Sequence, residues 1–102
     1  MSEGETEADL LAQKQRSMLK LLSAEDWLGE YSVRGPEGMS REQYDRCVAA
    51  VLRRFLDAAA EYAEIKRRLG GMSTARVERA MARRRAELDE IEARLEAPST
   101  PR

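Results

Sequence analysis

The feature that most constrains the fold is a long apolar repeat in residues 40–69. Apolar side chains recur there at alternating steps of four and three residues, which keeps one side of an α-helix apolar. The first row is Tyr44, Val48, Val51, Phe55, Ala58, Tyr62, Ile65 and Leu69, and the second is Leu52, Leu56, Ala59 and Ala63. Together they span roughly half of the helix circumference at about 100° per residue. So wide a face needs more than one neighbour, which predicts that this is the central helix.

Local signals indicate where this helix begins and ends. Ser40 is a favourable N-cap, and Gln43 occupies the second position of a capping box. Gly70 is placed to end the helix, and Ser73 can cap a further one. Two long helices joined by so short a link must fold back on each other. The sequence therefore predicts an antiparallel hairpin made of this helix and a helix at 74–97.

The helix predicted at 74–97 has a narrower apolar stripe, typical of one side of a coiled coil. Its seam is Val77, Met81, Arg84, Leu88, Ile91 and Leu95. Arg84 is the charged member of that seam, and folding the hairpin places it opposite two alanines of helix 40–69. We therefore expect its guanidinium to pass the alanines and pair with Asp57 or Glu61. Such a pair would specify the register of the hairpin.

A third apolar pattern precedes the hairpin. Leucines and a methionine fall at helical spacing in residues 7–31, and Thr6 with Asp9 forms a capping pattern. The segment "SAED" at 23–26 is a second capping signal, which predicts a kink or a new start there. The loop "VRGPEG" at 33–38 ends the helix because two glycines and a proline disfavour a helical backbone.

These patterns predict an all-α fold: a long antiparallel helical hairpin, coiled-coil-like, with an N-terminal helix packed across it. The three helices form a single domain at 7–97. Residues 1–6 and 98–102 are polar or contain proline, and we expect both ends to be disordered. The apolar faces of helices 7–31 and 40–69 exceed what one hairpin partner covers. We therefore expect self-association through apolar surface left on both helices.

The composition argues against several classes of function. The chain has no histidine and a single cysteine, Cys47, which removes Cys/His zinc sites, histidine-based triads and an internal disulfide. Paired carboxylates occur only in arrangements common on exposed helices, so we assign no catalytic residue, metal ligand or cofactor. The acidic N-terminus is no signal peptide, and the apolar run "CVAAVL" is too short to span a bilayer. We expect a cytoplasmic protein that is no enzyme and has no membrane partner.

Charge is distributed unevenly along the chain. Residues 66–85 hold eight basic groups and one acid, although the whole chain has a net charge of −1. The hairpin turn gathers a basic tip of six residues: Lys66, Arg67, Arg68, Arg76, Arg79 and Arg83. This tip fits a solvated end paired with nearby acids, a docking point for an acidic protein surface, or a nucleic-acid contact. No aromatic residue interleaves the arginines, which disfavours the last interpretation.

Three aromatic residues, Trp27, Tyr31 and Tyr44, flank the loop at 33–38. We expect them to close the first helix onto the second as part of the core. A hot spot for a partner is the alternative, because Trp and Tyr are frequent anchors in interfaces. The sequence as a whole favours a non-enzymatic interaction or assembly protein that packs, by coiled-coil or helix-in-groove contacts, against another copy or a heterologous helix. The alternative is a nucleic-acid-associated accessory protein, a small regulator or phage packaging component, that uses the basic tip.

Overall fold

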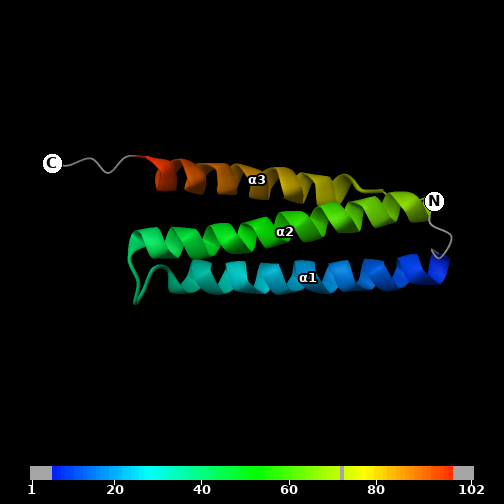
Figure 1. Cartoon of the computed structure of the whole chain (residues 1–102), viewed down its shortest axis with the longest axis horizontal. Helices are drawn as coiled ribbons and strands as arrows, with labels where there is room; N and C mark the ends of the chain where they lie inside the picture. Colours follow the sequence, from blue (N-terminus) through cyan, green and yellow to red (C-terminus); the bar gives the residue numbers. More distant parts are fainter. Residues whose placement is uncertain (1–5, 72, 98–102) are drawn as a thin grey trace.

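The computed structural model describes residues 6–71 and 73–97, and this part of the chain is all-helical. Its helices are α1 (Glu7–Arg34), α2 (Arg41–Leu69) and α3 (Ala75–Glu96). Helix α2 lies between the other two, and successive helices run in opposite directions (Figure 1). Both α1 and α3 pack on α2, whereas the backbones of α1 and α3 do not approach each other. Helix α1 therefore lies along α2 and does not cross both helices of the hairpin.

The predicted capping signals are present at the first two helix starts. Thr6 and Asp9 form a reciprocal capping box at α1, so Thr6, expected in the disordered N-terminus, is the N-cap. Ser40 and Gln43 form the second box, with two hydrogen bonds of 3.1 Å. The predictions of disorder for residues 1–5 and 98–102 fall outside the described residues.

The turn between α2 and α3 depends on two glycines. Gly70 and Gly71 have φ angles of 77° and 70°, a region of backbone conformation that L side chains disfavour. The Ser73 hydroxyl accepts a hydrogen bond from the Ala75 amide at 3.2 Å. The N-cap position itself belongs to Thr74, one residue later than predicted.

The prediction of a kink at 23–26 is wrong, because α1 is one continuous helix. Ala24 and Leu28 are both buried in the core. The apolar contact with α2 therefore runs through the segment and keeps it helical, since tertiary packing supplies most helix stability. The helix ends at Arg34, and its C-cap is Gly35, whose amide donates to the Tyr31 carbonyl at 2.8 Å.

The core forms where α2 meets its two neighbours. Both apolar rows of α2 are largely buried, and Leu52 and Ala59 are almost completely inaccessible. On α3 the seam contributes Leu88 and Ile91 to this core. No large apolar side chain in the described part of α2 is exposed. The expectation that α2 leaves apolar surface for another chain is therefore wrong, because α1 and α3 together cover its wide face.

Candidate interaction site

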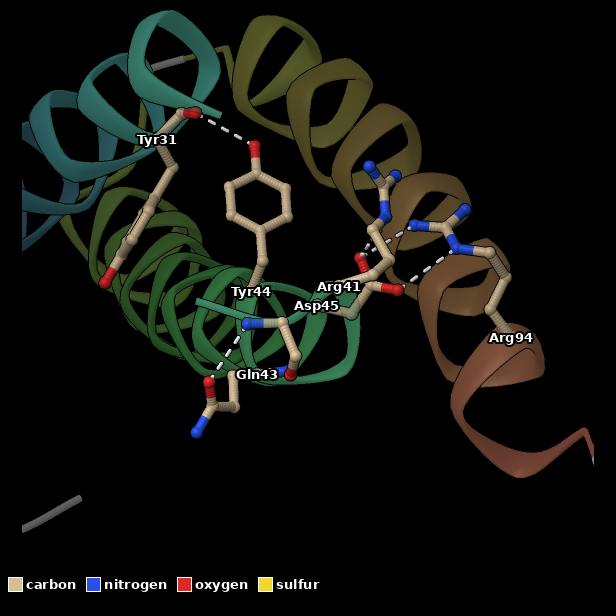
Figure 2. A network of polar contacts seen from close by, with 7 residues as sticks. Tyr31, Arg41, Gln43, Tyr44, Asp45 and Arg94 are labelled. Atoms are coloured by element: carbon tan, nitrogen blue, oxygen red, sulfur yellow. Dashed lines mark hydrogen bonds and ion pairs between the residues drawn. The ribbon is translucent and has the colours of Figure 1, made fainter. Parts of the chain in front are cut away.

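A buried carboxylate near the start of α2 joins α2 to α3. Asp45 is 3% exposed and accepts two hydrogen bonds from Arg94 of α3, at 3.2 Å from Nε and 3.0 Å from Nη2. Arg41 lies one helical turn earlier, with its Nε 3.5 Å from the same carboxylate. Figure 2 shows both guanidinium groups directed at Asp45. Hydrogen bonding to Asp45 raises the pKa of Arg94 above its ordinary value. This contact stabilises the pairing of α2 with α3.

The sequence reasoning missed this pair, although a signal for it exists. Asp45 precedes Ala49 by four residues and Leu52 by seven, so it extends the second apolar row of α2 by about two turns. A charged side chain in line with such a row is buried and needs a partner. Arg94 is not part of the apolar seam of α3, so the seam gave no reason to expect it as the partner of Asp45.

Two of the three predicted aromatic residues close α1 onto α2. The Tyr44 hydroxyl donates to the Tyr31 carbonyl at 2.9 Å, and their rings meet edge to face with centroids 6.0 Å apart (Figure 2). Hydrogen bonding to the Cys47 thiol and partial burial raise the pKa of the Tyr31 phenol. The core assignment of Trp27 is wrong: its ring lies beside that of Tyr31, tilted by 33° with centroids 6.0 Å apart, but the residue is 48% exposed.

Arg84 lies in the α3 seam and is mostly buried, with a side chain that is 17% exposed. Its guanidinium carbon is 5.5 Å from the centre of the Phe55 ring on α2. Nη1 is 2.9 Å from Glu87 of its own helix, and Nη2 is 3.2 Å from Glu25 of α1. The Nε atom is buried without a hydrogen-bond partner among the described residues. Arg84 therefore crosses the face of α2 and joins α3 to α1.

The predicted pairing of Arg84 with Asp57 or Glu61 is wrong. Both acids line a groove of about 450 Å³ between α1 and α2, and Glu61 lies 3.6 Å from Lys20 of α1. They therefore point to the side of α2 that Arg84 does not reach. Arg84 pairs with Glu25 instead, because the Glu25 carboxylate of α1 lies within reach of the Arg84 guanidinium.

The part of the basic tip that lies on α2 is largely neutralised. Arg67 pairs with Glu64 at 2.9 Å and with Glu78 of α3 at 3.6 Å. Arg68 shares Glu64, at 3.4 Å. Lys66 lies over the Tyr62 ring, 5.2 Å from its centre. These contacts fit the interpretation of a solvated end whose charges pair locally.

The part of the basic tip on α3 differs. Arg76, Arg79 and Arg83 are exposed and make no ion pair with any residue of the described part. They recur at steps of three and four residues, so they lie along one side of α3. The tip thus combines a paired half on α2 with an unpaired half on α3.

Most of the exposed apolar surface belongs to α1. Seven large apolar side chains are exposed in the described part of the chain, and six of them are on α1: Leu11, Met18, Leu19, Leu22, Trp27 and Val33. The apolar row predicted for 7–31 is split, because Leu21 and Leu28 are buried. Leu19 and Trp27 also border the groove between α1 and α2, whose other apolar lining is Ala24, Val51 and Ala58. The apolar sector of α1 is therefore wider than its contact with α2.

No family model, curated protein or solved structure matches the chain. Within residues 6–71 and 73–97, no group of histidine, cysteine, aspartate and glutamate side chains could hold a metal ion. None of the helices in these ranges is long and apolar enough to cross a membrane.

The Asp45–Arg94 pair should contribute far more than a surface pair between the same helices. Arg94→Gln is expected to lower the free energy of unfolding by about 1.5–3 kcal/mol, because a buried carboxylate loses a bidentate charged donor. Arg53, which bonds Glu92 at 2.8 Å on the exposed side of α2 and α3, supplies the control. Arg53→Gln should cost about 0–1 kcal/mol. Urea unfolding measures both, and equal losses would contradict the assignment.

Arg84 should matter through its packing more than through its charge. Arg84→Leu keeps an apolar stem over Phe55 and removes the unpartnered Nε, so its melting temperature should equal or exceed that of the parent. Arg84→Ala leaves a hole and should lower the free energy of unfolding by about 1–3 kcal/mol. Thermal melts of the two variants distinguish the contribution of packing from that of charge. A leucine variant that melts as low as the alanine variant would show that the ion pairs are essential.

Proposed function

We propose that the protein is a non-enzymatic helical interaction protein that assembles with copies of itself through the exposed apolar side of α1. Of the seven large apolar side chains that are exposed in the described part of the chain, six are on this one helix, and their concentration there carries the proposal. Exposed apolar residues scattered singly are ordinary on a protein surface, whereas a contiguous group marks an interaction site. At about 100° per residue, Leu11, Met18, Leu22 and Val33 lie within about 60° of one another around α1, and Leu19 lies next to them. The proposal includes no cofactor and no membrane partner, and the cytoplasm is the location we expect.

Coiled-coil packing within the chain is the second part of the proposal. The alternating seam of α3 and the first row of α2 support an antiparallel coiled coil between these helices. The α2 face is then occupied inside one chain, which leaves α1 as the helix that meets a partner. In this arrangement α2 and α3 serve as a rigid support for α1.

The proposed assembly predicts a molecular mass that rises with protein concentration. Leu19→Gln combined with Leu22→Gln should weaken this association without unfolding the chain, because both side chains are more than half exposed in the single chain. Met39→Gln changes an exposed apolar residue outside α1 and should leave the association unchanged. Sedimentation equilibrium measures the mass. A wild-type chain that stays monomeric at every accessible concentration would refute the proposal.

A nucleic-acid-associated role is the second candidate, and the unpaired arginines Arg76, Arg79 and Arg83 favour it. Replacing all three with glutamine should change the free energy of unfolding by no more than about 1 kcal/mol, since they make no ion pair in the described part. If this role holds, the parent binds mixed-sequence DNA or RNA with an affinity that falls steeply with salt, and the triple variant loses that binding. Absence of binding at low salt would dismiss the candidate.

A further inference from the structure

We propose that the second copy binds with its own α1 antiparallel to the first, and that the charges of α1 set this direction. The inference rests on the proposed self-association and adds the partner surface and its geometry. In the central part of α1, between residues 10 and 30, the sign of the charges changes once along the helix. Between residues 10 and 24 its charged side chains are all basic, and between residues 25 and 30 they are all acidic: Lys14, Arg16 and Lys20, then Glu25, Asp26 and Glu30.

Three of these six charges already have partners in the chain. Lys20 lies 3.6 Å from Glu61, Glu25 is bound by Arg84, and Glu30 is bound by Arg34 at 2.7 Å. The contacts of Lys20 and Glu25 link α1 to the other helices, and that of Glu30 lies within α1. These side chains are therefore poor candidates for recognition of a partner.

Lys14, Arg16 and Asp26 make no ion pair with any residue in the described ranges. Lys14 is partly buried, whereas Arg16 and Asp26 are exposed. Arg16 precedes Leu19 by three residues, and Asp26 follows Leu22 by four, so the two charges bracket exposed leucines on neighbouring turns of the helix. Between residues 16 and 26, the exposed side of α1 thus presents an unpaired cation, exposed leucines and an unpaired anion in order.

This order is self-complementary only when the two helices run in opposite directions. In a symmetric dimer, a contact from residue i to residue j is repeated from j to i. An antiparallel pair with its axis near residue 21 places Arg16 of each copy opposite Asp26 of the other, with Leu19 and Leu22 between the two ion pairs. A parallel pair would instead oppose like charges along the whole helix, which disfavours that arrangement.

Charge reversal tests the direction. Arg16→Glu and Asp26→Arg should each weaken self-association about ten-fold or more, because each variant opposes like charges at both ends of its own interface. An equal mixture of the two variants should associate again, since every facing pair in the mixed dimer is then opposite in charge. The double variant carrying both reversals should also recover. Sedimentation velocity of each single variant, of the mixture and of the double variant provides the measurement.

Two reversals on the exposed side of α3, Arg85→Glu and Asp89→Arg, make the same changes of charge away from α1 and should leave association unchanged. Circular dichroism melts verify that every variant folds. Single variants that retain wild-type association, or a mixture that stays monomeric, would overturn the antiparallel α1 interface while leaving self-association intact. If the parental chain bound the Arg16→Glu variant more tightly than it bound itself, the two helices would be parallel, because residue 16 of one copy would then face residue 16 of the other. A parent that never associates would refute both the interface and the proposed function.

Discussion

The width of the apolar face on α2 decides how the rest of the chain is arranged. One helix can cover only part of such a face, so α2 needs a neighbour on each side, and α1 and α3 meet this need without their backbones touching. The buried residues of α2 outnumber those of either neighbour, and Leu52 and Ala59 are almost completely sealed. The stability of the outer helices therefore depends on α2 more than on each other.

This arrangement leaves the outer helices unequal. Helix α3 has a narrow seam that α2 covers, and the remaining surface of α3 is rich in charge and alanine. Helix α1 has a wider apolar sector, and its contact with α2 buries only one side of it. Arg84 connects the two outer helices by reaching Glu25, but a single arginine covers little of α1. The unequal coverage leaves exposed apolar side chains on α1, which is the surface we propose for assembly.

Local patterns in the sequence predicted the helices well, and long-range polar contacts poorly. The capping boxes at Thr6 and Ser40 depend on residues three positions apart, so the sequence contains all the information for them. The partner of Arg84 depends on where α1 lies relative to α3, which no spacing within either helix determines. The prediction of a kink at 23–26 failed for a related reason. Burial of this segment against α2 stabilises the helix despite the capping residues in its sequence.

The candidate site was predictable in part for the same reason. The basic tip follows from the hairpin turn. Glu64 lies three and four residues before Arg67 and Arg68 on α2, so spacing alone indicates those pairs, whereas the pair of Arg67 with Glu78 depends on how α3 folds back onto α2. The exposed side of α1 could not be separated from its buried side by periodicity, because Leu21 and Leu22 both fit the helical pattern while only Leu21 is buried. The burial of Asp45 also depends on the approach of α3, although its place in an apolar row is visible in the sequence.

Hydrogen–deuterium exchange at several protein concentrations tests the central claim, that α1 is the helix left open by the single chain and closed by a second copy. Backbone amides exchange through local openings, so a partner that covers one helix slows exchange mainly there. We expect the amides of residues 11–22 to exchange more slowly as the protein concentration rises, while those of α3 change little. Slower exchange confined to α3, or exchange that is independent of concentration throughout the chain, would contradict this claim.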